Sequence, residues 1–330
     1  MKIAINGFGR IGRAVAKIII DRPGMELVAI NDLTDVETLA HLMKYDTSYG
    51  IWEHEVGHDD GDIIIDKQRV HSYAEKDPSN LPWKELEIDI VVESTGHFLT
   101  TEDANLHIKA GAKKVVLSAP PKDETPMYLV GVNADGYKGE AIVSNASCTT
   151  NCIAPVMKVL EETFGVEKSL MTTIHSYTAD QNLVDGPHKD LRRARAAACN
   201  IVPTSTGAAK AVYKTVPALK GIFDGLAVRV PTPVVSLSDI TAVLKKDVTV
   251  EEVNKAFKKA EAGVMAGILG TTEEPIVSSD MIKNKISSVV DLGLTQVVGD
   301  NLVKVISWYD NEWGYSERLV DLVAFISKKS

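Results

Sequence analysis

The segment KIAINGFGRIGR near the N-terminus constrains the fold most strongly, because three glycines separate a strand-like run from a helix. Gly7, Gly9 and Gly12 follow an apolar run at residues 2–5 and open a helical pattern at residues 10–21. In a nucleotide-binding βαβ unit, the first glycine permits a tight turn, the second lets the backbone approach a pyrophosphate, and the third allows close helix–strand packing. The pyrophosphate then lies on the helix N-terminus. Glycines also occur in ordinary turns, so the flanking strand and helix favour the nucleotide site.

Asp32 supports this interpretation, because it stands twenty residues after Gly12, at the end of the strand-like run 26–30. A carboxylate there can accept a hydrogen bond from the adenine ribose 2′-OH, and it would repel a 2′-phosphate. The neighbouring Leu33 offers no donor to such a phosphate. The two features predict a dinucleotide site that prefers NAD over NADP. The alternative is a turn followed by an aspartate that caps a helix.

The first 147 residues alternate between short apolar runs and helical patterns, which is typical of a parallel, doubly wound sheet. Helical patterns at residues 10–21 and 35–45 separate some of the runs. The expected strands are rich in Val and Ile and are 2–5, 26–30, 89–94, 113–119 and 141–145. The sequence therefore predicts an α/β protein whose residues 1–147 form a Rossmann-type NAD-binding domain.

Residues 148–314 have a different pattern, which predicts an α+β catalytic domain. Long strand-like segments at 169–178, 226–246 and 302–310 alternate in places, as in a mixed or antiparallel sheet with one covered face. A helix that Thr249 could cap is also expected; its range is 249–262. The amphipathic C-terminal segment, 315–330, is expected to be a helix that packs back on the NAD-binding domain.

Composition narrows the classes of function. A chain of 330 residues is long enough for about two domains. The formal net charge of −9 argues against nucleic acid or an anionic membrane as the main partner. Three cysteines indicate a reducing compartment. No apolar run is long enough to span a membrane, and the glycine-rich N-terminus does not resemble a signal peptide, so we expect a cytoplasmic protein.

The segment SNASCTTNC holds two of the three cysteines, four residues apart, at the start of a helical pattern that Gly165 would end. A helix N-terminus lowers the pKa of a thiol, so Cys148 is a candidate nucleophile. Cys152 lies one turn further in and is expected to be a small buried side chain. The alternatives are a disulfide, two unreactive core cysteines or a metal site, although zinc would need a second ligand pair that the sequence lacks. His175, late in a strand-like run, could accept the thiol proton or could be structural.

Segments spread over nearly the whole chain resemble the phosphorylating glyceraldehyde-3-phosphate dehydrogenase family. They are INGFGRIGR, VAINDLTD, KYDTSYG, SNASCTTNC, HSYTADQ, HKDLRRARAAA, PTSTGAAKAV, VRVPTP and WYDNEWGYS. The cysteine segment is specific to this family, whereas the glycine motif is not. The resemblance implies a homotetramer that oxidises D-glyceraldehyde 3-phosphate to 1,3-bisphosphoglycerate, with NAD as cofactor and inorganic phosphate as second substrate, in glycolysis and gluconeogenesis.

The same resemblance implies that Cys148 is the nucleophile and His175 the base. The thiolate would add to the aldehyde, hydride transfer would leave a thioester, and inorganic phosphate would release the product. The Cys148 backbone N–H and the His175 imidazolium are the candidate donors to the oxyanion. Thr178 and Arg229 would bind the phosphate of the substrate, although Arg229 could instead be an ion-pair partner on its strand. The residues expected to bind the attacking phosphate are Ser147, Thr149, Thr206 and Gly207.

The resemblance also implies the remaining cofactor contacts. Arg10 and Ile11 would lie at the pyrophosphate turn, Ser118 near the nicotinamide, and Asn311 on its carboxamide. Tyr315 would pack beside the nicotinamide. With Lys76, which stands where an arginine is expected near the adenine, the expected cofactor-binding residues are Gly7, Gly9, Arg10, Ile11, Gly12, Asp32, Lys76, Ser118, Asn311 and Tyr315. No metal ligand is expected.

The sequence departs from the family pattern near the strand that carries His175. Gly186 stands where NAD-type members have leucine, which weakens strict NAD preference, and Ala179 is a peripheral change. Two other functions remain open at this point. An erythrose-4-phosphate dehydrogenase would share the Cys–His pair but hydrolyse the thioester, and an NAD-binding regulator would keep the scaffold without the reaction.

Overall fold

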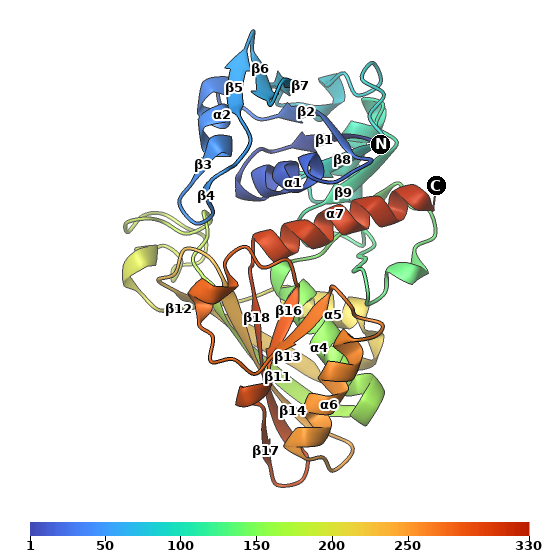
Figure 1. Cartoon of the computed structure of the whole chain (residues 1–330), viewed down its shortest axis with the longest axis vertical. Helices are drawn as coiled ribbons and strands as arrows, with labels where there is room; N and C mark the ends of the chain where they lie inside the picture. The colour runs from blue at the N-terminus through green and yellow to red at the C-terminus, as the bar shows by residue number, and fades with distance from the viewer. Residues whose placement is uncertain (330) are drawn as a thin grey trace. The chain divides into compact units, whose positions relative to one another are not determined.

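The computed structural model describes residues 1–329, which divide into two units (Figure 1). Unit 1 comprises Met1–Tyr128, Gly136–Ala146 and the residues from Ser316 on, and unit 2 comprises Leu129–Asp135 and Ser147–Tyr315. Each unit has its own eight-stranded sheet. None of the helices in residues 1–329 is both long and apolar enough to cross a bilayer.

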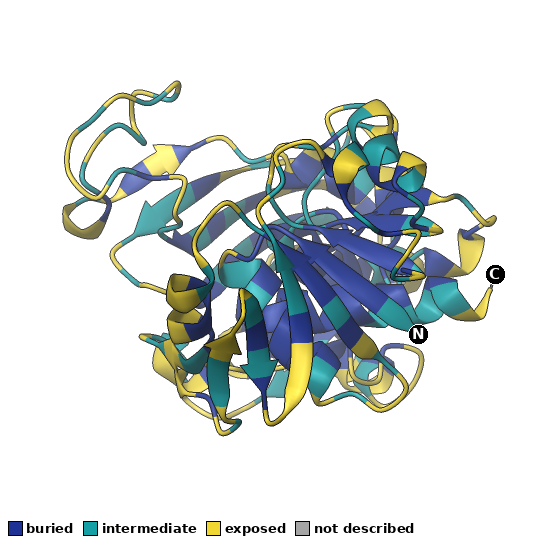
Figure 2. Cartoon of the chain, turned by 90° about the horizontal axis from the view of Figure 1, so that it is seen from above, coloured by how far each residue is buried: buried dark blue, intermediate teal, exposed yellow. Residues whose placement is uncertain are grey.

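Unit 1 is built on a sheet with the strand order β10-β9-β8-β1-β2-β7-β6-β5. The five expected strands are parallel neighbours in it: β1 (Lys2–Asn6), β2 (Glu26–Asn31), β8 (Ile90–Glu93), β9 (Lys114–Leu117) and β10 (Ile142–Ser144). Their Ile, Val and Ala side chains are almost wholly buried, so the strands near the N-terminus are mostly dark blue in Figure 2. The parallel sheet predicted for this part of the chain is confirmed.

Several strands of unit 1 were not expected. They are β3 (Tyr45–Asp46), β4 (Gly50–Ile51), β5 (Val56–Asp59), β6 (Asp62–Ile65) and β7 (Gln68–Tyr73). Strand β7 pairs with β2 in parallel, whereas β5 and β6 extend the sheet antiparallel. The polar sequences VGHD of β5 and QRVHSY of β7 lack the apolar run that indicates a buried strand. Strand β5 is the edge strand of the sheet, and β7, although it has a neighbour on each side, is mostly half-buried or exposed.

Helices α1 (Arg10–Ile20), α2 (Val36–Lys44) and α3 (Thr101–Lys109) follow β1, β2 and β8. The first two confirm the predicted helices, and α3 was missed because its apolar residues are few. From Ser316 on, helix α7 (Trp313–Lys328) belongs to unit 1. Arg22 attaches it there by ion pairs with Glu317 at 2.8 Å and with Asp321 at 2.5 Å.

Unit 2 contains the predicted mixed sheet, with the order β12-β13-β11-β14-β18-β16-β15 and β17 paired to β18. Its strands are β11 (Val166–Ser176), β12 (Val202–Thr204), β13 (Phe223–Val230), β14 (Ser236–Leu244), β15 (Leu269–Thr272), β16 (Ser288–Asp291), β17 (Gln296–Val298) and β18 (Leu302–Tyr309). Strand β11 pairs in parallel with β13 and antiparallel with β14.

Helices α4 (Cys148–Phe164), α5 (Ala208–Thr215) and α6 (Val250–Glu261) lie together on one face of this sheet (Figure 1). Thr249 caps α6 as predicted, in a capping box with Glu252. Along β11, Thr173 and His175 are buried and alternate with the more exposed Thr172 and Ile174. This alternation directs His175 to the face that α4 covers.

Short 3-10 turns complete the described fold. They are η1 (Pro78–Asn80), η2 (Ala134–Gly136), η3 (Ala197–Cys199), η4 (Pro217–Leu219), η5 (Ser278–Met281) and η6 (Leu292–Leu294).

Candidate active site

Cys148 is the first residue of helix α4, as the sequence predicts. Ser147 caps the helix, because its hydroxyl accepts a hydrogen bond from the backbone N–H of Thr150 at 3.0 Å. The helix ends at Gly165, whose φ of 72° lies in the left-handed region that favours glycine. The backbone N–H of Cys148 is therefore among those that a helix leaves without an internal partner.

His175 lies beside Cys148 and presents a basic nitrogen to it. Its Nδ1 is 2.7 Å from the carbonyl oxygen of Ser176, and a carbonyl oxygen only accepts. Nδ1 therefore carries the proton, and the lone pair of Nε2 faces the Sγ atom of Cys148 at 3.5 Å. The two side chains come from different elements, α4 and β11, and the fold places them in contact.

The expected net lowering of the pKa of Cys148 is wrong, although backbone N–H groups at the start of α4 do act in that direction. Cys148 keeps some exposed surface, but burial of its sulfur raises the thiol pKa, and the opposing effects of Thr149 and Arg229 are smaller. Burial also lowers the pKa of His175 to about 3, and the positive charge of Arg229 acts in the same direction. The pair is therefore a neutral thiol beside a neutral imidazole, which is the form that can accept the thiol proton.

Cys152 has a different environment, although it is only one helical turn away. Its side chain is fully buried, with Sγ 3.8 Å from the hydroxyls of both Ser238 and Ser288. Burial raises the pKa of this thiol to about 11. The prediction that Cys152 is a small buried side chain is confirmed. All three cysteines are free thiols, and no group of His, Cys, Asp and Glu within residues 1–329 could hold a metal ion.

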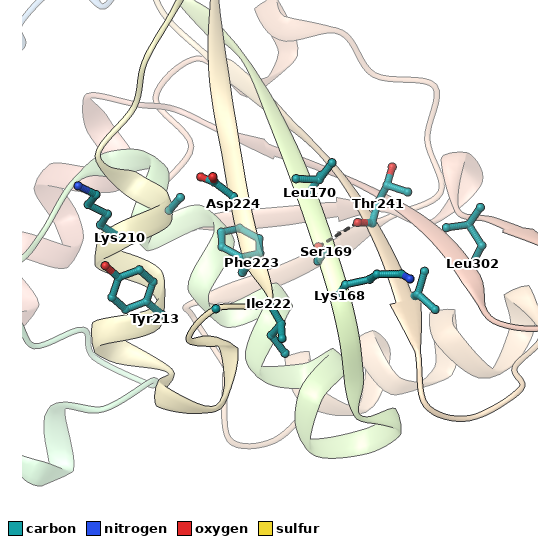
Figure 3. A pocket seen from close by; sticks show the side chains of 13 residues that line it. Lys168, Ser169, Leu170, Lys210, Tyr213, Ile222, Phe223, Asp224, Thr241 and Leu302 are labelled. Carbon is teal, nitrogen blue, oxygen red and sulfur yellow. Dashed lines mark hydrogen bonds between the residues drawn. The ribbon is translucent and has the colours of Figure 1, made fainter.

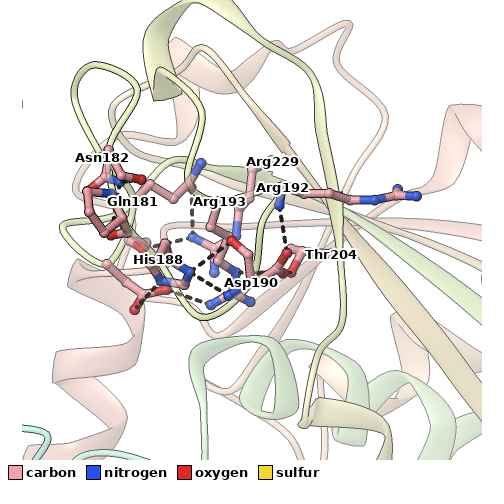
Figure 4. Close-up of polar contacts among 12 residues, drawn as sticks. Gln181, Asn182, His188, Asp190, Arg192, Arg193, Thr204 and Arg229 are labelled. Carbon is pink, nitrogen blue, oxygen red and sulfur yellow. Dashed lines mark hydrogen bonds and ion pairs between the residues drawn. The ribbon is translucent and has the colours of Figure 1, made fainter.

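Arg229 forms a cationic site next to His175. Its Nη1 donates to the Thr178 hydroxyl at 2.9 Å and lies 3.4 Å from the side-chain oxygen of Gln181 (Figure 4). The buried Nε of Arg229 and the buried Nε2 of Gln181 have no hydrogen-bond partner among residues 1–329. Buried donors without a partner are rare in folded proteins, so both nitrogens are available to an acceptor that the chain itself does not supply.

Gln181 and Arg193 are site residues that sequence reasoning missed. Gln181 lies 8% exposed at the end of a turn, with its backbone N–H bonded to the carbonyl of Thr178 at 2.9 Å. Arg193, near Arg229 in Figure 4, is held by the Thr204 hydroxyl at 3.0 Å and by the carboxylate of Asp180 at 2.5 Å. Its charge adds to the lowering of the pKa of His175. The cluster of arginines in the segment DLRRARAAA could have pointed to Arg193 as a residue that binds an anion.

The other candidate phosphate ligands lie at two helix starts. The Thr149 hydroxyl is 3.0 Å from the phenol oxygen of Tyr309, a fully buried residue that sequence reasoning missed. Thr206 and Gly207 immediately precede α5, and the Thr206 hydroxyl accepts from the N–H of Ala208 at 3.1 Å. Helix α5 packs on α4, so both helix starts belong to one face of unit 2.

Asn311 is oriented by two serines of unit 2. Its side-chain oxygen accepts from the Ser176 hydroxyl at 2.9 Å and from the Ser236 hydroxyl at 3.0 Å. This leaves the amide NH2 group to donate to a further acceptor. Tyr315 is 4% exposed near the start of α7, and Ser118 belongs to unit 1.

Unit 1 contains a cavity of about 560 Å³ at the ends of its parallel strands. Its lining residues are Asn6, Gly7, Gly9, Asn31, Asp32, Leu33, Glu75, Lys76, Ser94, Thr95, His97 and Phe98. Such a position, outside the carboxyl ends of parallel strands, is where doubly wound sheets bind nucleotides.

The glycines make room for this cavity as the motif predicts. A Cβ on Gly7, whose φ is +90°, would lie 2.6 Å from the backbone nitrogen of Thr95, and one on Gly12 would lie 2.1 Å from the carbonyl oxygen of Gly7. Gly9, by contrast, has open space around it. Asp32 is held rigidly, because its two carboxylate oxygens accept from the backbone N–H groups of Phe8 at 2.8 Å and Thr34 at 3.0 Å. These residues fit the backbone approach of a pyrophosphate and a ribose.

Two of the expected cofactor contacts, Arg10 and Ile11, are not among the residues that line this cavity. The guanidinium of Arg10 pairs with Asp46 at 2.9 Å and lies over the ring of Tyr49, so it has a local structural partner. Ile11 is half-buried within α1, and Lys76 is an exposed residue at the cavity edge. The structure brings Gly7, Gly9, Asp32 and Lys76 to one cavity. It brings Cys148, His175, Thr178 and Arg229 to one cluster in unit 2.

Comparison with known proteins covers both units. Residues 1–101 match the family model "Glyceraldehyde 3-phosphate dehydrogenase, NAD binding domain", and residues 147–311 match "Glyceraldehyde 3-phosphate dehydrogenase, C-terminal domain". The chain is 54% identical over 331 residues to glyceraldehyde-3-phosphate dehydrogenase of Geobacillus stearothermophilus, covering 100% of this chain and 99% of the relative. It is 53% identical to glyceraldehyde-3-phosphate dehydrogenase 1 of Bacillus subtilis (strain 168), with the same coverage. It is also 53% identical over 336 residues to the Mycobacterium avium protein of that name, covering 99% of each chain.

Proposed function

Because the chain belongs to the glyceraldehyde-3-phosphate dehydrogenase family, we propose that Cys148 and His175 carry the phosphorylating oxidation of glyceraldehyde 3-phosphate. The chain catalyses the NAD-dependent oxidation of this aldehyde in glycolysis. The observation that supports the proposed roles best is the 3.5 Å approach of Nε2 of His175 to Sγ of Cys148. We assign residues 1–147 to NAD binding, with the C-terminal helix, and residues 148–314 to catalysis.

The proposed reaction starts from the neutral pair. Nε2 of His175 accepts the thiol proton as Sγ of Cys148 bonds to the aldehyde carbon, and the proton then goes to the aldehyde oxygen, giving a thiohemiacetal. NAD, when bound, supplies the hydride acceptor. His175 takes the hydroxyl proton as the hydride leaves, and a thioester remains on Cys148. The Cys148 N–H donates to the negative oxygen that develops, since the helix does not use it.

The two phosphates are proposed to bind at separate places in unit 2. Arg229, Thr178 and Gln181 suit the phosphate of the substrate, because two of their buried donors lack partners. Inorganic phosphate would approach the thioester through the hydroxyls and N–H groups at the starts of α4 and α5; these are Ser147, Thr149, Thr206 and Gly207. Attack on the thioester carbon releases 1,3-bisphosphoglycerate, and His175 returns its proton to Cys148.

We propose that the catalytic face of unit 2 is only part of the assembly, and that the chain is a homotetramer. The sheet face opposite α4 carries exposed apolar side chains, including Leu170 at 66% and Leu226 at 46%. A hollow of about 850 Å³ is lined partly by residues of this face, such as Leu170 and Leu302, and partly by Lys210 and Tyr213 of α5 (Figure 3). An apolar face of this kind on a sheet favours contact with a second copy of the chain. Its mass in solution, measured by light scattering, tests the tetramer.

We also propose that the protein is cytoplasmic and has no nucleic acid or membrane partner. The supporting features are three free thiols and the formal net charge of −9.

The decisive assay follows reduction of NAD with glyceraldehyde 3-phosphate in the presence and absence of inorganic phosphate. We expect sustained turnover only with phosphate, and a much lower rate with erythrose 4-phosphate. Phosphate-independent turnover would instead indicate hydrolysis of the thioester, as in an erythrose-4-phosphate dehydrogenase. NAD binding without turnover of either sugar would indicate a regulator. NADP, assayed in parallel, tests the preference assigned to Asp32.

A further inference from the structure

A buried polar network lies under the cavity of unit 1 and is not used by the reaction. Asn6, Asn31 and Glu93 are the last residues of three adjacent parallel strands, β1, β2 and β8. They are register partners, because Asn6 lies opposite Asn31 on one side and opposite Glu93 on the other. All three are at most 4% exposed, and Glu93 and the nearby His107 are 0% exposed.

The network fixes the protonation of His107. Trp83 Nε1 donates to Nδ1 of His107 at 3.0 Å, and an indole N–H can only donate. Nδ1 must therefore be the acceptor, so the proton of the neutral ring is on Nε2. Nε2 lies 3.1 Å from a carboxylate oxygen of Glu93 and donates to it. His107 is thus a donor held in one tautomer by a tryptophan that packs behind it.

Glu93 is surrounded by donors. One carboxylate oxygen accepts from the Asn6 amide at 2.5 Å and from His107, and the other accepts from the N–H of Thr95 at 2.8 Å and from its hydroxyl. Four donors match the acceptor capacity of an ionised carboxylate, so the buried charge is compensated without an ion pair. A neutral amide at this position would turn an NH2 group towards some of these donors.

The groups that Glu93 holds form the wall of the cofactor cavity. Three residues of the network line the cavity: Asn6, Asn31 and Thr95. The side-chain oxygen of Asn6 extends the network, because it accepts a hydrogen bond from the Asn31 amide at 2.7 Å. Asn31 in turn bonds the N–H and the carbonyl of Glu75, each at 2.8 Å. One carboxylate therefore ties together the turns that follow β1, β8 and β7.

Thr95 is the most important of these residues, because its backbone nitrogen lies so close to Gly7 that no side chain fits there. A Cβ at Gly7 would come within 2.6 Å of that nitrogen. The Ser94 hydroxyl, in the same turn, donates to the carbonyl of Gly7 at 2.6 Å. The turn after β8 therefore packs directly on the glycine turn, and Glu93 fixes its position.

We propose that Glu93, oriented by His107, is a positioning residue for the dinucleotide: it holds Asn6, Thr95 and the glycine turn in the geometry that binds NAD. Since Glu93 has no exposed surface, it acts only through these neighbours. The inference rests on the proposed assignment of the unit 1 cavity to NAD.

The test is Glu93→Gln, an isosteric change that leaves the shape of the side chain and removes its double acceptor character. We expect the dissociation constant and the KM for NAD to rise about tenfold, since buried donors left unpaired weaken the geometry they support. The kcat at saturating NAD should stay within about twofold, because Cys148 and His175 belong to unit 2. Thr95→Val removes one hydroxyl donor to Glu93 and should raise the dissociation constant and the KM for NAD by a smaller factor. It replaces Glu93→Gln as the test if that variant does not fold.

Val91→Ala is the matched control, since Val91 is fully buried on the same strand and makes no bond to the network. It should lower the melting temperature without changing NAD affinity. Asp32→Ala tests whether NAD binds in this cavity at all, because Asp32 lines it. If Asp32→Ala weakens NAD binding and folded Glu93→Gln and Thr95→Val do not, the inference is wrong. If none of the three changes NAD binding, the assignment of the cavity fails. A fall in kcat with unchanged NAD affinity would also overturn the positioning role.

Discussion

His175 and Arg229 are register partners on the neighbouring parallel strands β11 and β13. Parallel pairing places both side chains on the same edge of the sheet in unit 2. The base and the cation therefore share one site, although they are far apart in sequence. The arrangement explains why the charge of Arg229 contributes to the low pKa of His175. Arg229 therefore has two properties that can be tested separately: its positive charge, which a lysine would keep, and its forked guanidinium, which a lysine lacks.

Arg229→Lys should raise the KM for glyceraldehyde 3-phosphate about tenfold, because an ammonium keeps the charge but not the bidentate fork that suits a phosphate. The retained charge should leave the environment of His175 largely intact, so kcat should change much less. Initial rates at varied substrate concentration measure the effect. Unphosphorylated glyceraldehyde is the control substrate, and its kcat/KM should not change. An equal loss with both aldehydes would show that Arg229 does not bind the phosphate.

His175→Asn should slow formation of the thioester by roughly 10²–10⁴-fold, the usual contribution of a general base. Asparagine can keep a donor towards the Ser176 carbonyl, but it offers no basic nitrogen to Cys148. A single-turnover burst of NADH, recorded by stopped flow, isolates this step. The dissociation constant for NAD, measured by titration, is the control and should be unchanged. A decrease of less than about tenfold would mean that His175 is structural.

Thiol alkylation should distinguish the three cysteines. We expect iodoacetamide to modify Cys148 fastest, because Nε2 of His175 can take its proton, and substrate should protect it. Cys199 is exposed and has no such base, whereas Cys152 is fully buried and should react only on unfolding. Peptide mass spectrometry over time gives the three rates. In His175→Asn the rate at Cys148 should fall towards that of Cys199. If Cys199 were fastest in the unmodified protein, Cys148 would lose its role as the activated thiol.

Local sequence patterns predicted the elements that carry the site. Ser147 caps α4 and Gly165 ends it, since caps and stops are encoded by neighbouring residues. His175 was expected late in a strand-like run, and it lies near the end of β11. Partners that are distant in sequence could not be predicted in the same way. The ion pair between Arg10 and Asp46, which are 36 residues apart, is one such contact.

The effect of burial on pKa values could not be predicted from the sequence either. The helix N-terminus was expected to lower the pKa of Cys148, yet the larger effect is burial by several elements of unit 2, which raises it. Gln181 was missed for a similar reason, because its importance comes from a buried amide nitrogen that faces no partner. The Glu93 network likewise depends on strand register, which brings three polar strand ends side by side. Such features arise from packing and not from a local pattern.

The last prediction concerns stability and His54, which joins two carboxylates in unit 1. Nε2 lies 2.9 Å from a carboxylate oxygen of Asp21, and Nδ1 contacts the carboxylate of Asp66. Carboxylates only accept, so both ring nitrogens must carry protons, and the hydrogen bond to Asp66 raises the pKa of His54 above its ordinary value. The folded pKa is therefore higher than the unfolded one. The stabilisation is fully present below the unfolded value and is lost as the pH rises through the folded value.

His54→Gln should therefore lower the free energy of unfolding by about 0.2–1 kcal/mol at pH 6, the usual range for exposed ion pairs, and by much less at pH 9. Urea unfolding at the two pH values measures the difference. His58→Gln is the matched control for the loss of a histidine, because His58 is exposed on strand β5 of the same unit. A loss of stability that is the same at pH 6 and pH 9 would show that His54 contributes by packing against Trp52, whose ring centroid is 4.4 Å away, and not by its charge.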